Sequence, residues 1–211
     1  MKRKPVDLFL REVIRWEPDQ GFLRVDHHIR RITRSADALG FRAPNDPIKQ
    51  LKAHVAGATP LAVNVQMNHR GELQITSEPY TAIPVDSVWN VKIATKTKLD
   101  SADTFYRHKS TRREPYIAAR SEYDPKEINE VLLLNERGEI CEGTETSIFL
   151  PDGSEMLLTP PLESGILPGV LRAELIRERK AKGQVLRPAD LNGKEFYVGN
   201  SLHGLVRAKL A

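Results

Sequence analysis

The chain has 211 residues, 40% of them hydrophobic and 28% charged, a balance typical of a globular protein with a buried core. Its single cysteine, Cys141, excludes an internal disulfide framework and a cysteine-based zinc site, and it fits a reducing cytoplasm. The net charge of +4 comes from basic residues interleaved with acidic ones, which favours a small anionic ligand over nucleic acid. No apolar run predicts a signal peptide or a membrane span.

The first part of the chain reads as an α/β lobe. Strands are predicted at residues 8–16 and 22–25, and the helical spacing of apolar residues then predicts a helix containing Ile29, Ile32, Ala36 and Leu39. Gly40 ends this helix, and a second helix is expected at residues 47–55. Further strands are predicted at residues 61–67, 73–76 and 88–94. Because residues 95–104 are polar and lack periodicity, we expect two lobes, residues 1–100 and 101–211.

The second part of the chain is expected to begin with a helix around Tyr116 and Ala119. Apolar runs then predict strands at residues 131–134, 139–141, 148–150, 156–158, 185–186 and 196–198. A strong helix is predicted from Val170 to Lys182, with Gly183 as its cap. The whole chain therefore reads as α/β.

Lys109 is the first candidate for chemistry. A lysine that forms a Schiff base must be uncharged part of the time, and neighbouring cations favour that form. Arg107, Arg112 and Arg113 flank Lys109. Taken alone, the same residues are equally compatible with a solvated basic loop.

Two further features follow Lys109 in the chain. Glu142 ends a strand just before Gly143, where the backbone can approach a flat ring. Gly169 then leads into a helix, and the unpaired amides of a helix start suit a phosphate, as does the small-residue turn containing Ser201. An amine, an acid and a phosphate-binding helix start, in that order, favour an enzyme that holds pyridoxal phosphate (PLP). The alternatives are an edge carboxylate and an ordinary loop without a role.

Metal catalysis is not expected. The adjacent His27 and His28 point apart on any regular element and make a poor chelate, and no suitably spaced set of ligands accompanies them. The sequence also lacks a phosphate-binding P-loop, a dinucleotide-binding GxGxxG motif and the nucleophile elbow of hydrolases.

These features resemble the class IV aminotransferases, the PLP enzymes of fold type IV. The similarity extends over nearly the whole chain, and the segments that carry it are Leu10–Arg15, His28–Ile32, His108–Arg113, Asn135–Glu142, Gly165–Arg172 and Val198–Gly204. The resemblance implies a two-lobed α/β fold like that of D-amino acid aminotransferase, with a trimmed N-terminal lobe and PLP in the cleft. It also implies a homodimer.

The resemblance also assigns roles to residues. Lys109 would bind PLP covalently and move the proton, and Glu142 would bind the pyridine nitrogen. The phosphate would be held by Arg31, the backbone amides of Val170 and Leu171, and the hydroxyl of Ser201. A weaker hypothesis gives Arg107, His108 and Arg113 to an anionic, amino-bearing substrate.

Two departures concern the substrate. His203 stands where arginine is common in the family, and Arg113 and Glu114 stand where the aminotransferases carry an aromatic residue. We therefore expect a lyase that converts 4-amino-4-deoxychorismate to 4-aminobenzoate and pyruvate for folate synthesis. The alternative is an aminotransferase that uses branched-chain or D-amino acids with 2-oxoglutarate. A non-enzymatic basic binding module and an inactive PLP-binding relative also stay open.

Overall fold

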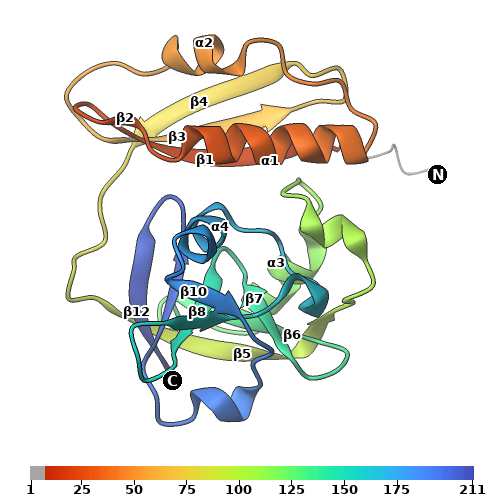
Figure 1. The fold of residues 1–211 in the computed structure, drawn as a ribbon, viewed down its shortest axis with the longest axis vertical. Coiled ribbons are helices and arrows are strands. Elements are labelled where there is room, and N and C mark those ends of the chain that lie inside the picture. Colours follow the sequence, from red (N-terminus) through yellow and green to blue (C-terminus); the bar gives the residue numbers. More distant parts are fainter. Residues whose placement is uncertain (1–7) are drawn as a thin grey trace. The chain divides into compact units, whose positions relative to one another are not determined.

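A computed structural model describes residues 8–211, whose contacts group them into two compact units (Figure 1). The first unit contains the described residues up to Thr81 together with His108–Arg112, and the second contains Ala82–Arg107 and Arg113–Ala211. This grouping differs from the expected boundary at residue 100, because residues 88–99 form a strand of the second unit. The assignment of two functional lobes at residue 100 stays a prediction.

The first unit is a four-stranded antiparallel sheet with two helices. Its strand order is β2-β1-β3-β4, from β1 (Leu10–Glu17), β2 (Gly21–Phe22), β3 (Leu61–Met67) and β4 (Leu73–Pro79). The helices are α1 (Val25–Ala38) and α2 (Pro47–Lys52). The strand predicted at residues 22–25 is too long, because Arg24 has a φ of 57° and turns the chain into α1.

One face of this sheet carries the core of the first unit. Alternate residues of β1 are buried, and Ile14 lies opposite Val63 of β3. Both helices pack on this face, with Ile32 of α1 and Leu51 of α2 among the buried side chains. The period-two burial of the strand and the helical spacing of α1 therefore meet in one core, as their sequence patterns require.

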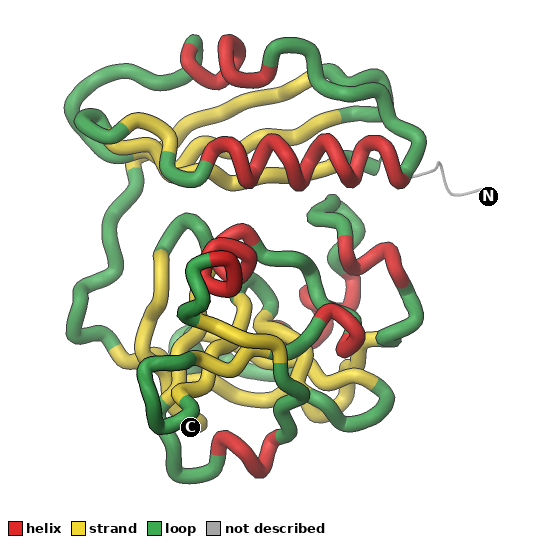
Figure 2. Tube along the Cα trace, viewed as in Figure 1, coloured by secondary structure: helices red, strands yellow, loops and turns green. Residues whose placement is uncertain are grey.

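The second unit is built on a curled eight-stranded sheet (Figures 1 and 2). The strand order is β10-β9-β8-β11-β12-β5-β6-β7. The bounds are β5 (Val88–Leu99), β6 (Glu130–Asn135), β7 (Ile140–Gly143), β8 (Ser147–Pro151), β9 (Leu157–Thr159), β10 (Ala181–Gly183), β11 (Phe196–Asn200) and β12 (Gly204–Leu210). The curl brings the ends of the sheet together, since Ile140 N of β7 donates to Leu186 O beyond β10 at 2.7 Å.

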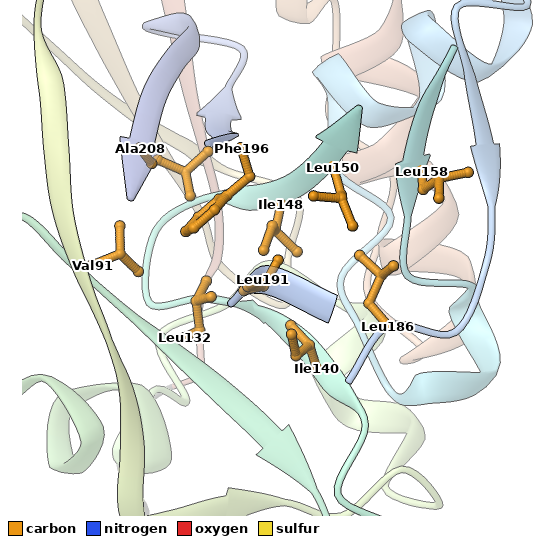
Figure 3. Packing of buried hydrophobic residues seen from close by; sticks show 11 residues of the cluster. Val91, Leu132, Ile140, Ile148, Leu150, Leu158, Leu186, Leu191, Phe196 and Ala208 are labelled. Atoms are coloured by element: carbon orange, nitrogen blue, oxygen red, sulfur yellow. The ribbon is translucent and has the colours of Figure 1, made fainter. Parts of the chain in front are cut away.

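Short helices complete the second unit. They are α3 (Glu114–Arg120), α4 (Val170–Arg177) and the 3₁₀ turns η1 (Thr104–Arg107), η2 (Leu162–Ser164) and η3 (Pro188–Leu191). Figure 3 shows the main apolar cluster, in which side chains from six strands and η3 point toward one another, including Val91, Leu132, Ile140, Ile148, Phe196 and Leu191. Among residues 8–211, no helix is both long and apolar enough to span a membrane.

Strand β5 runs five residues beyond the predicted end at Ala94. The polar stretch after Ala94 was expected to be irregular, but the Glu122 carboxylate accepts hydrogen bonds from the backbone amides of Thr95, Lys96 and Thr97, at 2.7, 3.1 and 2.9 Å. The pairing of β5 with β6 shifts its register at this point, as in a β-bulge. A distant carboxylate therefore binds a bulge that has no hydrophobic period.

Helix α4 is five residues shorter than predicted. It ends at Arg177, and Arg179 has a φ of 58°, a left-handed conformation that stops the helix. The chain then forms β10, in which the buried Ala181 pairs with Leu157 of β9. Gly183 is a strand residue and not the helix cap.

Candidate active site

The backbone around Lys109 is attached to β1 of the first unit. Arg11 N donates to Lys109 O at 2.8 Å, Leu10 and Ser110 form a β-bridge, and Thr111 N donates to Phe9 O at 2.9 Å. The segment thus adds a short strand beside β1, even though it lies almost 100 residues away in the sequence. Lys109 is half-buried.

Arg31 lies in the same unit and binds a buried carboxylate on β1. Its Nε and Nη2 donate to the two oxygens of Glu12 at 2.8 and 2.6 Å. His28, one helical turn earlier on α1, places Nδ1 2.6 Å from Glu12 Oε2. Glu12 faces the helix because it alternates with Leu10 and Ile14. The predicted phosphate ligand therefore has its guanidinium oriented by a fixed partner.

The charges on α1 decide the protonation state of Glu12. Burial by itself raises the pKa of a carboxyl group, because the ionised form loses its hydration. The opposing attraction of Arg31 and His28 is stronger, and it lowers the pKa of Glu12 from an ordinary 4.5 to about 2. Glu12 is therefore a carboxylate at neutral pH, and it balances the buried guanidinium.

Glu142 lies at the end of β7 in the second unit and is buried. Its Oε1 accepts hydrogen bonds from the hydroxyl of Tyr116 at 2.7 Å and from Leu167 N at 3.2 Å. Burial, and next the negative charge of Glu142, raise the pKa of Tyr116, so the phenol stays protonated and donates. Arg113 stacks over the Tyr116 ring at 4.7 Å. The sequence had suggested Glu142 but not its partner Tyr116.

The start of α4 packs closely against two strands. A Cβ on Gly169 would lie 2.7 Å from Ser147 Oγ, and a Cβ on Gly199 would lie 2.3 Å from Gly204 O and 3.1 Å from a methyl of Leu171. Ser147 and Gly199 are paired across β8 and β11. We call Gly169–Leu171 and Gly199–Ser201 the phosphate cradle. No side chain caps α4 within the described chain, so its first amides point into this cradle.

The turn that carries Ser201 is held by its neighbour Asn200. Asn200 Oδ1 accepts from the amides of Leu202 and His203, both at 3.0 Å, and its Nδ2 donates to Glu145 O at 3.2 Å. Ser201 is buried in this turn. The structure thus brings four predicted cofactor residues into the second unit, which are Glu142, Val170, Leu171 and Ser201, whereas Lys109 and Arg31 belong to the first.

The three residues suggested for the substrate have different surroundings. Arg113 Nη2 donates to Thr144 O and to Glu145 Oε1, so it holds the turn that follows Glu142. Arg107 has a buried Nε with no hydrogen-bond partner among residues 8–211. The Nδ1 of His108 lies 3.0 Å from Ser35 Oγ in the first unit. Only Arg113 contributes to the hollow described next.

The second unit contains a hollow of about 600 Å³ beside α3. This volume falls within the usual range for small-molecule sites, roughly 300–1,000 Å³. Its wall combines rings and guanidinium groups, among them Trp89, Tyr116, Tyr123, His203, Arg113 and Arg120. Such a wall suits a planar anion, since rings offer apolar faces and guanidinium groups bind carboxylates.

Comparison with known proteins identifies the family. The family model described as amino-transferase class IV matches residues 10–211. The chain belongs to this family. Class IV aminotransferases are PLP-dependent, and the mixed α/β fold with its curled sheet is theirs. The predicted fold class and coenzyme are thereby confirmed.

The related proteins carry different assignments. A Thermotoga maritima protein, provisionally assigned as a branched-chain-amino-acid aminotransferase, is 28% identical over 159 residues, which cover 73% of this chain and 57% of that protein. The chain therefore spans little more than half the length of this curated relative.

A solved structure from Mesorhizobium loti, provisionally assigned as an amino-acid aminotransferase, is 43% identical with a TM-score of 0.92 and covers 97% of this chain and 100% of that one. A Legionella pneumophila structure, provisionally assigned as a 4-amino-4-deoxychorismate lyase, is 19% identical with a TM-score of 0.77 and covers 98% of this chain and 87% of that one. At that identity the second likeness shows the fold alone.

The residues of the second unit fit PLP. The cradle is so close-packed that Gly169 and Gly199 leave no room for a Cβ, and this allows backbone amides to approach a phosphate. Glu142 supplies a buried carboxylate for a protonated pyridine nitrogen. Acid, backbone donors and hydroxyl are the three kinds of group that this coenzyme needs apart from its lysine.

Proposed function

We propose that this chain is a PLP-dependent lyase that converts 4-amino-4-deoxychorismate to 4-aminobenzoate and pyruvate. The observation that carries the PLP chemistry is the pairing of a buried acid, Glu142, with the close-packed cradle at α4. The observation that supports this substrate is the hollow of about 600 Å³ with its rings and guanidinium groups. The substrate is a ring with two carboxylates, which such a wall can bind.

Each proposed residue has a distinct task. Lys109 binds the coenzyme and, once the substrate amine has displaced it, takes the proton from the carbon that bears the nitrogen. Arg31, fixed by Glu12, binds the phosphate together with the cradle. Glu142 keeps the pyridine nitrogen protonated, and the bound coenzyme thereby supplies an electron sink.

Bond changes in the substrate follow from that proton transfer. The electron pair left by the proton forms a ring double bond, and the carbon–oxygen bond to the enolpyruvyl group breaks. The leaving enolate takes up a proton and becomes pyruvate, while the ring becomes aromatic as 4-aminobenzoate. No oxidant or second substrate is needed, and aromatisation drives the step forward.

The second candidate is a class IV aminotransferase that acts on branched-chain or D-amino acids. The Mesorhizobium loti relative, 43% identical along nearly its whole length, favours this candidate. Both reactions begin with the same proton abstraction, so the residues that hold the coenzyme suit both. They differ in whether a leaving group departs or the proton returns to the coenzyme.

The first test removes the proposed lysine. We expect Lys109→Ala to lose the visible absorbance of lysine-bound PLP and nearly all activity, because no amine remains to bind the coenzyme or accept the proton. Lys194→Ala is the matched control, since Lys194 is exposed on a loop of the second unit. Absorbance spectra and a pyruvate-release assay measure both effects. A colourless wild-type protein that binds nucleic acid in a salt-sensitive manner would instead support a basic binding module.

A single-turnover experiment without keto acid separates the two enzymatic candidates. Wild-type protein mixed with aminodeoxychorismate is expected to release pyruvate and to leave the PLP absorbance intact. If amino acids convert the coenzyme to its amine form and aminodeoxychorismate gives no pyruvate, the chain is an aminotransferase. Coenzyme binding with neither reaction would make it an inactive relative.

A further inference from the structure

Glu130, the first residue of β6, is a buried carboxyl group that the proposed chemistry does not use. It accepts five hydrogen bonds. Oε1 accepts from Val131 N at 2.8 Å, Thr144 N at 2.9 Å and Thr144 Oγ1 at 2.6 Å. Oε2 accepts from Glu145 N at 3.1 Å and Thr146 Oγ1 at 2.8 Å. All five donors are neutral, and four belong to the turn Gly143–Thr146.

This turn is wrapped tightly around the carboxyl group. Gly143 N donates to Thr146 O at 2.7 Å, and Thr144 N also lies 3.0 Å from Val131 O. A Cβ on Gly143 would lie 2.4 Å from Thr146 Oγ1 and 2.7 Å from the Glu130 carboxyl, so no other residue fits here without movement. The geometry of the turn is therefore set by Glu130 and by the absence of a side chain at Gly143.

The turn joins two parts of the proposed coenzyme site. Glu142 precedes it directly, and Ser147 follows it. Ser147 pairs with Gly199 and lies against Gly169, so it contacts both halves of the phosphate cradle. Any change in the shape of the turn moves the acid relative to the cradle.

We propose that Glu130 is a positioning residue that fixes the distance between Glu142 and the phosphate cradle. The inference rests on the proposed PLP function, because it assigns a role toward the same site. Glu130 does not touch the coenzyme. It acts through the turn, which must hold an acid at one end of the coenzyme ring and a cradle at the other.

The test is Glu130→Gln, which keeps the shape of the side chain but replaces one acceptor oxygen by a donor. Two or three of the five hydrogen bonds are then lost. We expect the dissociation constant of PLP to rise about ten- to a hundredfold, measured by equilibrium dialysis. We also expect the absorbance spectrum of the bound coenzyme and its pH dependence to change, because Glu142 no longer meets the pyridine nitrogen in the same position.

Glu139→Gln is the matched control. Glu139 is also buried, and it lies at the other end of the β6–β7 hairpin, where it binds Arg137, Asn135 and Ser164. It should lower thermal stability without altering PLP affinity or the spectrum. If Glu130→Gln behaves in the same way as this control, Glu130 has a merely structural role and the inference is overturned.

A milder pair of variants applies if Glu130→Gln fails to fold. Thr144→Val removes one hydroxyl donor at nearly constant volume, and Thr144→Ser retains it. The inference requires weaker PLP binding in the first variant and wild-type binding in the second, and equal binding in both contradicts it. Wild-type protein that binds no PLP overturns the proposed function itself, whereas normal wild-type binding with an unaffected Glu130→Gln overturns this inference alone.

Discussion

Glu12 shows how a single residue can serve a site from the core. It lies on a strand face with Leu10 and Ile14, where an unpaired carboxylate would be very unfavourable. Arg31 and His28 compensate for this because they lie one helical turn apart on the facing helix. The result is a guanidinium that cannot swing away, which is what a phosphate ligand needs.

Replacing Glu12 tests this arrangement. At pH 7 we expect Glu12→Gln to lower the free energy of unfolding by about 3–5 kcal/mol, because it leaves a buried guanidinium without its counter-charge. Urea denaturation measures this quantity. Glu78→Gln, an exposed carboxylate on β4, is the control and should stay within about 0.5 kcal/mol.

The same pair of proteins gives a pH dependence with a definite sign. The pKa of Glu12 is about 2 in the folded chain and about 4.5 ordinarily, so the folded state is favoured while Glu12 is ionised. Its stabilisation is complete above about pH 4.5 and is lost as the pH falls toward 2. The difference between wild type and Glu12→Gln should shrink over that window. A constant difference from pH 6 to 2.5 would contradict the pKa assignment.

Sequence reasoning found the local features of the site and missed the distant ones. Glu142 and Gly169 could be singled out because each lies at a strand end or helix start that a short pattern reveals. Glu12 and Glu130 could not, because their partners lie 14 to 19 positions away along the chain. A possible signal for Glu12 was an acid in an alternating apolar strand, followed by His28 and Arg31 at helical spacing.

At the scale of elements, the β11–β12 hairpin sets the shape of the cradle. A side chain on Gly199 would collide with a backbone carbonyl, which cannot rotate away as a side chain can. We expect Gly199→Ala to destabilise the protein by about 1–3 kcal/mol and to weaken PLP binding, because Leu171 on α4 must also move. Thermal unfolding and PLP titration measure the two effects.

Gly183→Ala is the matched control for this prediction. Gly183 is also a strand residue, but a Cβ there would meet only Pro161 atoms, at an ordinary 3.7 Å. It should bind PLP like the wild type. Equal PLP affinity in Gly199→Ala and Gly183→Ala would mean that the cradle does not depend on this close contact.

The positions of most elements followed from periodicity, and the errors have tertiary causes. The end of α4 was placed too late because the residues after it retain helix-forming character, whereas the structure uses them to extend the sheet beside β9. The end of β5 was placed too early because Glu122, more than 20 positions away, binds its polar half. Neither interaction leaves a trace in the local sequence.

At the scale of the molecule, we propose that the chain assembles as a homodimer, as its family membership implies. Analytical ultracentrifugation at micromolar concentration should then give twice the chain mass of 23.8 kDa. Addition of PLP should not lower that value. A monomer with full activity and bound PLP would contradict the proposal.

The attachment of residues 108–112 to β1 has a consequence for how the chain can be divided. The backbone leaves the first unit after Thr81, returns at His108 and leaves again after Arg112. Between the first two crossings it forms β5, which lies in the middle of the other sheet between β12 and β6. A single break in the backbone therefore never releases both bodies intact: a nick near residue 100 separates one from its last strand and splits the other through its centre. The gene cannot be halved into two self-sufficient fragments, and recombination between relatives must exchange the crossing segments together.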